Sequence, residues 1–321
     1  MERLIRSIYR PHNLYCIHID SKSQTMYETM QKYAPCFENV ILIQDRINVT
    51  YAHFTRVSAD LKCFDALLQR NTKWSYLINL CGEDFPLKTN YQIVKVLKGL
   101  FGKQSIESVS LTRGKGKSLR FEKSWIPSHL FNGRPNESKW KEITDWSGTK
   151  WYKSLGSYKM QSFPLGNKFP MFAGSAYNIF SRDFINWTVN NLTAQRIIKW
   201  SRDTYSPDEF LWATLSRFNE APDSFPVEDG FDVNDFNSLA RIVIWEGKKN
   251  HLECSGRWQR QICVLGFNEV GWLLRQKQLF ANKFSTNDPD SEVAIQCLER
   301  ALRKMEQLEA CDEEIKLDQL L

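Results

Sequence analysis

Hydrophobic and polar residues follow two different periods along the first third of the chain. Short apolar runs predict buried strands, and the segments between them repeat apolar residues every three or four positions, as amphipathic helices do. The strands are expected at 13–20, 40–43 and 76–81, and the helices at 3–9, 25–32 and 59–69. Strands that alternate with helices predict an α/β fold with a mostly parallel sheet flanked by helices.

The same two periods continue, more loosely, through the rest of the chain. We expect a strand at 175–180, a helix at 185–200 and a charged amphipathic helix at 289–311. Ser206 as the cap and Pro207 as the first helical residue predict the start of another helix. Residues 103–170 keep neither period and are rich in Lys, Gly, Ser and Trp, so we expect irregular loops there.

The charge and composition exclude some classes of protein. The 43 Lys and Arg residues against 37 Asp and Glu give a net charge of +6, without a dense basic run. Nucleic acid is therefore not an expected partner. Eleven Trp residues are many for 321 residues, and indole faces stack well on sugar rings, although most Trp residues belong to cores.

Cysteines and glycosylation sequons indicate the secretory pathway. Eight cysteines occur without a Cys-x-x-Cys pair, which argues against a zinc site. The sequons that accept N-linked glycans begin at Asn48, Asn136, Asn186 and Asn191. The first nine residues are charged and amphipathic, with no apolar run that suits a signal peptide or a membrane anchor.

Two acidic segments are candidates for chemistry. Ligands of parallel sheets bind beyond the carboxyl ends of the strands, where Asp20 and the segment 82–86 are expected. Asp208 and Glu209 follow Pro207 at a predicted helix N-terminus. These acids either complement the helix dipole or provide a general base, with Glu209 accepting a proton from a hydroxyl group.

Other motifs carry less chemistry. Residues 113–118 resemble a phosphate-binding loop, but Leu111 stands where that loop requires glycine, so we expect a mobile basic loop. Asp288-Pro-Asp290 is the one Asp-x-Asp motif, and it does not follow a strand, so we expect no metal there. The five histidines are scattered and suggest no ligand cluster.

A small loop presents cations near the C-terminal third. Cys254 and Cys263 are nine residues apart around a glycine, a spacing that suits a disulfide loop. Arg260 lies inside this loop, and Lys283 follows it. Together they either hold a diphosphate without a metal or are ordinary surface cations.

Taken together, these segments resemble the core 2 / I-branching β-1,6-N-acetylglucosaminyltransferase family, glycosyltransferase family 14. The similarity runs from about residue 3 to 302 and is interrupted near 108–165. The residues that carry it are 13–20, 76–86, 172–177, 203–209, 254–256, 272–275 and 279–284.

The resemblance implies a GT-A fold whose first strand is absent from this sequence. It implies a single catalytic domain, with a nucleotide-sugar-binding half at 1–102, acceptor-side loops at 103–170 and a catalytic and acceptor half at 171–321. The implied reaction moves N-acetylglucosamine from UDP-N-acetylglucosamine to the 6-hydroxyl of a galactose or N-acetylgalactosamine in an O-glycan of a glycoprotein. The anomeric centre inverts and a β-1,6 branch forms.

The resemblance also implies a role for individual residues, without a metal cofactor. Glu209 is the implied base, and Arg260 and Lys283 neutralise the leaving diphosphate. The remaining implied positions are Asp20, Ser21, Lys22 and Tyr51 near the UDP, Glu107 and Trp245 near the acceptor, and the disulfides Cys16–Cys63 and Cys254–Cys263.

Some features depart from the family pattern. Members that make core 2 branches often carry Lys where Gly230 stands and Tyr where Gly247 stands. Members also carry a membrane anchor upstream, which this sequence lacks, so we expect an N-terminally truncated form of a lumenal Golgi enzyme. The alternatives are a non-catalytic Golgi protein that binds a glycan or a partner, and a related xylosyltransferase.

Overall fold

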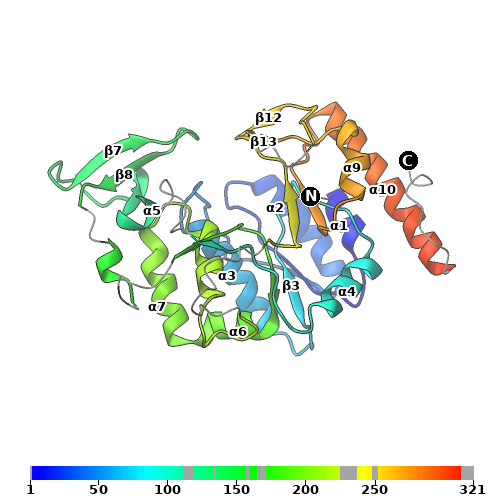
Figure 1. Ribbon diagram of the computed structural model, residues 1–321, viewed down its shortest axis with the longest axis horizontal. Helices are drawn as coiled ribbons and strands as arrows, with labels where there is room; N and C mark the ends of the chain where they lie inside the picture. Colours follow the sequence, from blue (N-terminus) through cyan, green and yellow to red (C-terminus); the bar gives the residue numbers. More distant parts are fainter. Residues whose placement is uncertain are drawn as a thin grey trace.

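The computed structural model describes residues 2–110, 119–133, 135–156, 159–164, 166, 171–224, 237–247 and 252–311. Within them, helices pack around several small sheets (Figure 1). Strands β1 (Tyr15–Ile17) and β2 (Val40–Leu42) pair in parallel, with α2 (Gln24–Tyr33) between them in the chain. These elements, and α3 (Thr55–Leu68) after them, confirm the predicted order in this part of the chain.

The sheets are mixed rather than mostly parallel, so that expectation is met only in part. Strand β3 (Tyr76–Ile78) pairs antiparallel with β10 (Ile179–Ser181). In the described part of the chain, the other parallel pair is β11 (Arg241–Val243) with β14 (Phe280–Asn282). Further antiparallel pairs are β14 with β4 (Phe85–Pro86), β5 (Val109–Ser110) with β9 (Phe172–Ala173), and β12 (Trp258–Gln259) with β13 (Ile262–Cys263).

The prediction of irregular loops at 103–170 is wrong for part of that segment. It contains an antiparallel sheet in the order β6-β8-β7, made of β6 (Trp125–Pro127), β7 (Trp140–Thr144) and β8 (Lys150–Ser154). Trp151 of β8 is fully buried and packs with Ala52 and Trp125. The strands escaped prediction because isolated aromatic residues among lysines, not apolar runs, provide their buried face.

Two helical expectations are corrected. The helix predicted at 185–200 is two helices, α6 (Arg182–Asn190) and α7 (Leu192–Trp200), divided where the Asn191 side chain caps α7. Ser206 does not cap a helix, because its backbone is left-handed (φ +49°) and its side chain accepts no capping bond. It precedes a short 3₁₀ turn, Pro207–Glu209, and then α8 (Leu211–Leu215).

The largest core lies where α3, α6, α7 and α8 meet. Phe64, Phe180 and Trp212 contact one another there with ring centroids 5.4 to 5.6 Å apart. A second core joins α9 (Val270–Leu274) and α10 (Pro289–Ala310) to β4 and β14. No helix in the described ranges has the length and apolar composition that a membrane crossing requires.

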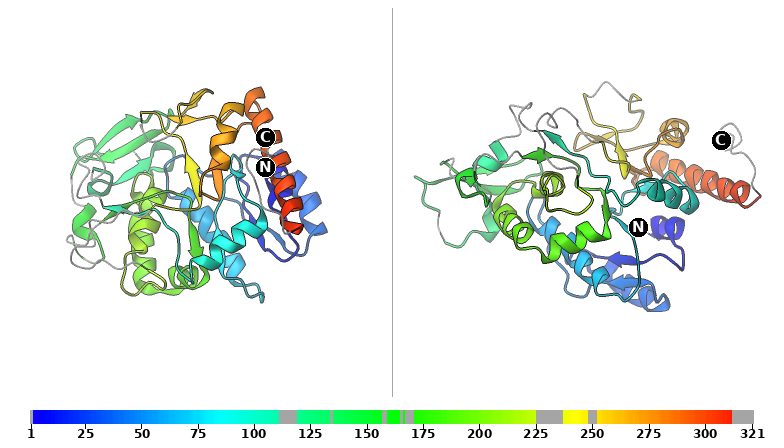
Figure 2. Two further views of the ribbon diagram at one scale, coloured as in Figure 1. Left: turned by 45° about the vertical axis from the view of Figure 1, so that its right-hand side comes forward. Right: turned by 60° about the horizontal axis from the view of Figure 1, so that its bottom comes forward.

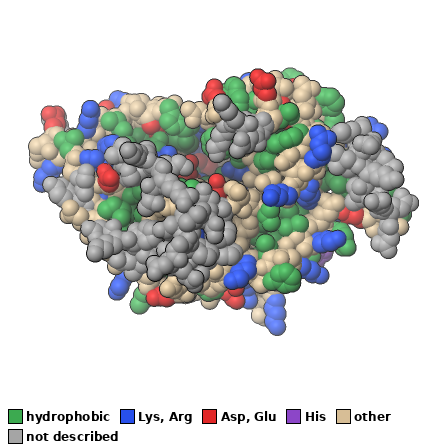
Figure 3. Space-filling model, viewed as in Figure 1, with side chains coloured by type: hydrophobic (Ala, Val, Ile, Leu, Met, Phe, Trp, Pro, Cys, Tyr) green, Lys and Arg blue, Asp and Glu red, His purple; other side chains and the backbone are tan. Residues whose placement is uncertain are grey.

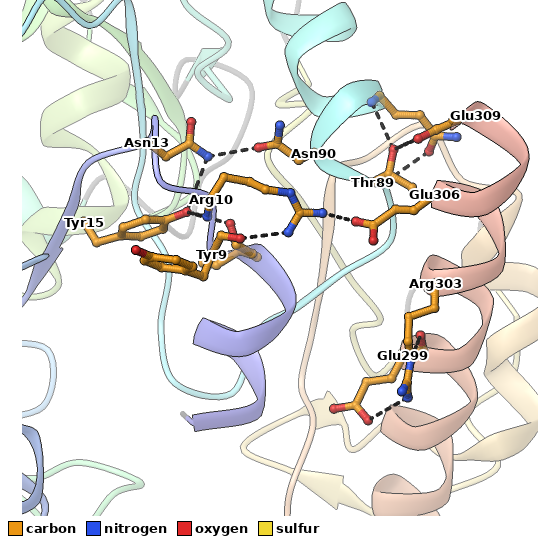
Figure 4. A network of polar contacts seen from close by, with 12 residues as sticks. Tyr9, Arg10, Asn13, Tyr15, Thr89, Asn90, Glu299, Arg303, Glu306 and Glu309 are labelled. Atoms are coloured by element: carbon orange, nitrogen blue, oxygen red, sulfur yellow. Dashed lines mark hydrogen bonds and ion pairs between the residues drawn. The ribbon is translucent and has the colours of Figure 1, made fainter. Parts of the chain in front are cut away.

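The first and last helices lie side by side at one end of the molecule (Figures 1 and 2). Arg3 of α1 (Glu2–Ile8) donates two hydrogen bonds, of 2.9 and 2.8 Å, to the Glu299 carboxylate of α10. Farther along, Arg10 forms an ion pair with Glu306, and the Thr89 hydroxyl bonds to Glu309 (Figure 4). Thr89 caps α4 (Asn90–Gly99), so α10 is attached to two other helices.

Replacing Cys16 and Cys63 by serine should lower the free energy of unfolding by about 4 kcal/mol, because their disulfide closes a loop of 47 residues in the unfolded chain. In the folded protein the disulfide joins β1 to α3. Asp20 follows β1 and Tyr51 precedes α3 in the chain. Urea unfolding measures the change, and Cys36→Ser, at an exposed free thiol, is the control. A double variant as stable as the control would contradict this prediction.

Candidate functional site

A cavity of about 490 Å³ lies where the loops after β1 and β2 approach two hairpins, β7–β8 and β12–β13. The surface is hollowed between the parts of the molecule that carry these hairpins (Figure 3). The residues lining the cavity are Lys22, Asn48, Thr50, Tyr51, Ser128, His129, Ser147, Thr149, Lys150 and Arg260. Three of the predicted donor-binding residues, Lys22, Tyr51 and Arg260, are thus brought together.

Asp20 and Ser21 order one wall of this cavity. The Asp20 carboxylate accepts the Lys22 backbone N–H at 3.0 Å and lies 3.2 Å from the Lys22 Nζ. The Ser21 N–H donates to the Ile47 carbonyl at 3.1 Å, and the Lys22 Nζ donates to the Val49 carbonyl at 2.5 Å. The loop after β1 is therefore joined to the segment that ends at Tyr51.

Arg260 is held at the turn of the β12–β13 hairpin. Arg260 and Gln261, the two residues of that turn, both have left-handed backbones, with φ of +56° and +60°. This conformation is unfavourable for residues other than glycine, so the surrounding structure must impose it. The Cys254–Cys263 disulfide joins the hairpin to the preceding chain, and the fully buried Glu269 carboxylate accepts the Ser255 N–H at 2.8 Å.

The guanidinium of Arg260 lies beside a pair of aromatic rings that contact each other. Its Cζ is 5.0 Å from the ring centroid of Tyr51 and 5.7 Å from that of Trp146. The two rings meet edge to face at 4.8 Å. Burial, together with the negative charge of Glu209, raises the pKa of Tyr51 to about 12, so its hydroxyl stays protonated at neutral pH.

Lys283 is near this hairpin but does not line the cavity. Its Nζ pairs with the Glu83 carboxylate at 2.8 Å, and its carbonyl accepts the Leu265 N–H at 2.8 Å. Leu265 follows Cys263 by two residues, so Lys283 lies beside the base of the hairpin that carries Arg260. Glu83 belongs to the segment 82–86 that the sequence placed at the end of a strand.

Glu209 ends the 3₁₀ turn before α8, and its side chain is 43% exposed. Its carboxylate forms an ion pair with Arg120 of α5 (Leu119–Glu122). Its carbonyl accepts the Gly174 N–H at 2.8 Å. A Cβ atom at Gly174 would lie 1.9 Å from the Glu107 carbonyl oxygen, so only glycine allows these two segments to approach. The predicted base and the predicted acceptor residue Glu107 therefore flank one glycine.

Sequence reasoning missed Arg120. It follows residues 113–118, which lie outside the described residues, and no motif distinguishes it from neighbouring basic residues. The one available signal was its position in the Lys-rich segment 103–170, where the resemblance implies acceptor-side loops.

Asp208 occupies a more enclosed position than Glu209. Burial, together with the charge of Glu209, raises the pKa of Asp208 to about 7, and the nearby Arg56 opposes that shift. Arg56 in turn forms an ion pair with Asp60, at 2.7 Å. The neighbouring acids Asp208 and Glu209 thus lie between two arginines, Arg56 and Arg120.

Trp245 lies on the other side of the Arg260 hairpin. It forms a β-bridge with Ile262, and the next residue, Glu246, donates its N–H to the Gln261 carbonyl at 2.9 Å. Gly247 follows with a left-handed backbone (φ +77°) that disfavours the tyrosine of the family pattern. Gly230 lies outside the described residues.

The remaining predicted features take structural or surface positions. Asp288 caps α10 and accepts a bond from Arg257 at 3.0 Å. Among the sequon residues, Asn48 lines the cavity, Asn136 and Asn186 are exposed, and Asn191 caps α7. The structure contains both expected disulfides.

The chain belongs to the Core-2/I-Branching enzyme family, which it matches over residues 1–274. Beta-1,3-galactosyl-O-glycosyl-glycoprotein beta-1,6-N-acetylglucosaminyltransferase 3 of Rattus norvegicus is 39% identical over 313 residues, which cover 94% of this chain and 64% of the relative. Beta-1,3-galactosyl-O-glycosyl-glycoprotein beta-1,6-N-acetylglucosaminyltransferase of Homo sapiens is 38% identical, with 94% and 66% covered. A protein of the same name from Bovine herpesvirus 4 is 38% identical, with 94% and 64% covered. The chain spans just under two thirds of the length of these curated relatives.

Asp208→Asn should make the protein more stable above neutral pH. The folded-state pKa of Asp208 exceeds its ordinary value of 3.8, so the stability that it contributes is present below pH 4 and is lost as the pH rises through about 7. Between pH 5 and 8 we expect the free energy of unfolding of the unaltered protein to fall by about 1–3 kcal/mol relative to the variant. Urea unfolding at both pH values tests this. Asp183→Asn, at an exposed carboxylate, should keep the original pH dependence.

Gly174→Ala should destabilise the protein by about 1–3 kcal/mol, because the added methyl group has no room beside the Glu107 carbonyl and the Ala213 side chain. Gly99→Ala is the matched control, since the space around Gly99 is open. Thermal unfolding of both variants measures the difference. Equal melting temperatures would show that the segments of Glu107 and Glu209 can separate without cost.

Proposed function

We propose that this chain is the catalytic part of an inverting β-1,6-N-acetylglucosaminyltransferase that branches O-glycans. The observation that carries the proposal is the pairing of an accessible carboxylate, Glu209, with a cationic cavity beside it. Family membership and the names of the relatives support the same reaction. We infer a GT-A fold, UDP-N-acetylglucosamine as donor and the Golgi lumen as the location of the enzyme.

Glu209 acts as the general base. The carboxylate takes the proton of the acceptor 6-hydroxyl while that oxygen attacks C1 of the donor sugar from the face opposite the diphosphate. The C1–diphosphate bond breaks as the new bond forms, so the α-linked donor gives a β-linked product. Arg120, which pairs with Glu209, orients the carboxylate and then shares it with the incoming hydroxyl.

Arg260 and Lys283 stabilise the leaving diphosphate without a metal. Charge develops on the β-phosphate as the C1 bond breaks, and preorganised cations lower the energy of that transition state. The imposed backbone of the Arg260 turn supplies this preorganisation. Lys283 is 10% exposed and forms an ion pair with Glu83. When the donor binds, Lys283 gives up this carboxylate and contacts a phosphate instead.

Glu107 and Trp245 form the acceptor side. Glu107 adjoins Glu209 through Gly174, and Trp245 offers an aromatic surface next to the hairpin of Arg260. The left-handed Gly247, which departs from the pattern of the core 2 enzymes, is a reason to test acceptors beyond core 1 as well. We therefore propose that the acceptor is a galactose or N-acetylgalactosamine of an O-glycan, with core 1 and poly-N-acetyllactosamine chains as the first candidates.

Glu209→Gln should lower acceptor-dependent release of UDP from UDP-N-acetylglucosamine by about 100- to 10,000-fold, because the amide cannot accept the hydroxyl proton. The assay contains EDTA and both candidate acceptors, and the unaltered chain should remain active in it. Glu220→Gln, at an exposed carboxylate outside the cavity, is the control and should retain full activity.

Two other outcomes distinguish the alternatives. UDP binding without turnover for any acceptor would favour a non-catalytic glycan-binding protein. Turnover with UDP-xylose in place of UDP-N-acetylglucosamine would favour a xylosyltransferase.

Loss of activity in EDTA that is restored by a divalent metal would contradict the metal-free mechanism.

A further inference from the structure

The turn of the β7–β8 hairpin is an ordered structure, although the sequence suggested a loop. The Asp145 carboxylate accepts the backbone N–H groups of Ser147 and Thr149 at 2.8 and 3.0 Å. It also accepts the Trp151 indole N–H at 2.9 Å and the Tyr205 hydroxyl at 3.2 Å. Trp151 is fully buried, so the turn is anchored in the core of the small sheet.

This turn and the β12–β13 hairpin that carries Arg260 face each other (Figure 1), and residues of both line the cavity. Trp146 at its tip is 59% exposed, yet its ring contacts Tyr51 and lies 5.7 Å from the Arg260 guanidinium. Three neighbours of Trp146, namely Ser147, Thr149 and Lys150, line the cavity. This large aromatic residue is therefore exposed next to the cavity, in contact with two of its lining residues.

The charges around the cavity favour an anion. Its lining contains Lys22, Lys150 and Arg260 together with His129, and no Asp or Glu is among the described residues that line it. Lys150 has one weak partner, the Glu142 carboxylate at 3.6 Å, and both side chains are largely exposed. Such a pair contributes little stability, so Lys150 exchanges Glu142 for a phosphate at small cost.

We propose that the β7–β8 hairpin is a third wall of the nucleotide-diphosphate site, in which Lys150 contacts the β-phosphate and Trp146 positions Arg260 over the diphosphate. This inference rests on the proposed function, because the nucleotide sugar is its ligand. Both residues lie within 108–165, outside the sequence motifs that carry the resemblance to the family, so those motifs assign them no role. Lys150 of this hairpin is then a third cation at the diphosphate, in addition to Arg260 and Lys283.

Lys150→Ala should weaken UDP binding about tenfold in isothermal titration calorimetry with EDTA, the loss expected for one charge-assisted hydrogen bond. The affinity for UMP should fall less than threefold, because UMP lacks the β-phosphate. Lys141→Ala is the matched control: it removes the same charge from an exposed position on the same hairpin, outside the cavity lining. It should leave both affinities unchanged.

The outcomes separate this inference from the proposed function. If the unaltered chain does not bind UDP, both are overturned. If the unaltered chain binds UDP and Lys150→Ala binds it equally well, only the third wall is overturned. An equal loss in the Lys141 variant would show a general effect of surface charge and would also overturn the proposed contact.

Trp146 is a positioning residue. Its test must therefore distinguish a specific effect on donor binding from a general loss of folded protein. Trp146→Ala should raise the donor KM about tenfold with little change in the acceptor KM, and Trp146→Phe should restore most of the loss because a ring still faces Arg260. Equal changes in both KM values, or no rescue by phenylalanine, would contradict the positioning role.

Discussion

The position of the β12–β13 hairpin, which carries Arg260, depends on the hydrogen bonds that the Glu269 carboxylate accepts. It is fully buried and accepts the N–H groups of Ser255 and Gly266 at 2.8 and 2.7 Å. A buried carboxylate without such donors would be strongly destabilising, so the two backbone segments cannot move apart without a large cost in free energy. Because Ser255 follows Cys254, this one side chain and the adjacent disulfide fix both sides of the loop that presents Arg260.

The segment that Glu269 holds also contacts α10, and through α10 it is connected to α1. Gly266 packs directly against the Asp290 carboxylate, close enough that a Cβ atom would lie 1.8 Å from it. Asp290 lies in the first turn of α10, and α10 is joined to α1 through Arg3 and Glu299. The helices at the two ends of the described chain therefore support a hairpin at the site, over a distance that no local sequence pattern spans.

The two halves of the site differ in their electrostatics. Around Glu209, Arg56 and Arg120 form ion pairs with Asp60 and Glu209, so the charges are partly compensated while the Glu209 side chain remains 43% exposed. Around the cavity, cations exceed acids, and two aromatic rings cover the guanidinium instead of an acid. An accessible carboxylate suits proton transfer, and a cavity whose described lining residues include cations but no acid suits a diphosphate. The proposed reaction requires both at neighbouring positions.

The sequence by itself determined several of the local elements and singled out the candidate residues of the site. Apolar runs and helical spacing located β1, β2, α3 and α10, and the resemblance to the family selected Glu209, Arg260 and Lys283. Those signals are local, or they lie in motifs whose residue order is visible along the chain. The cysteine spacing likewise indicated the loop around Arg260.

Only the tertiary structure decided which side chains meet. Arg120 and Glu209 are 89 residues apart, and Trp146 and Arg260 belong to different hairpins, so neither contact has a sequence signature. The three-stranded sheet was missed because its buried face consists of single aromatic residues whose partners are distant in the chain. Ser206 failed as a helix cap for a related reason, since its N–H bonds to Ala52 across the site and this contact sets its backbone. Contacts between distant segments are fixed by packing and shared hydrogen bonds, which the order of residues does not display.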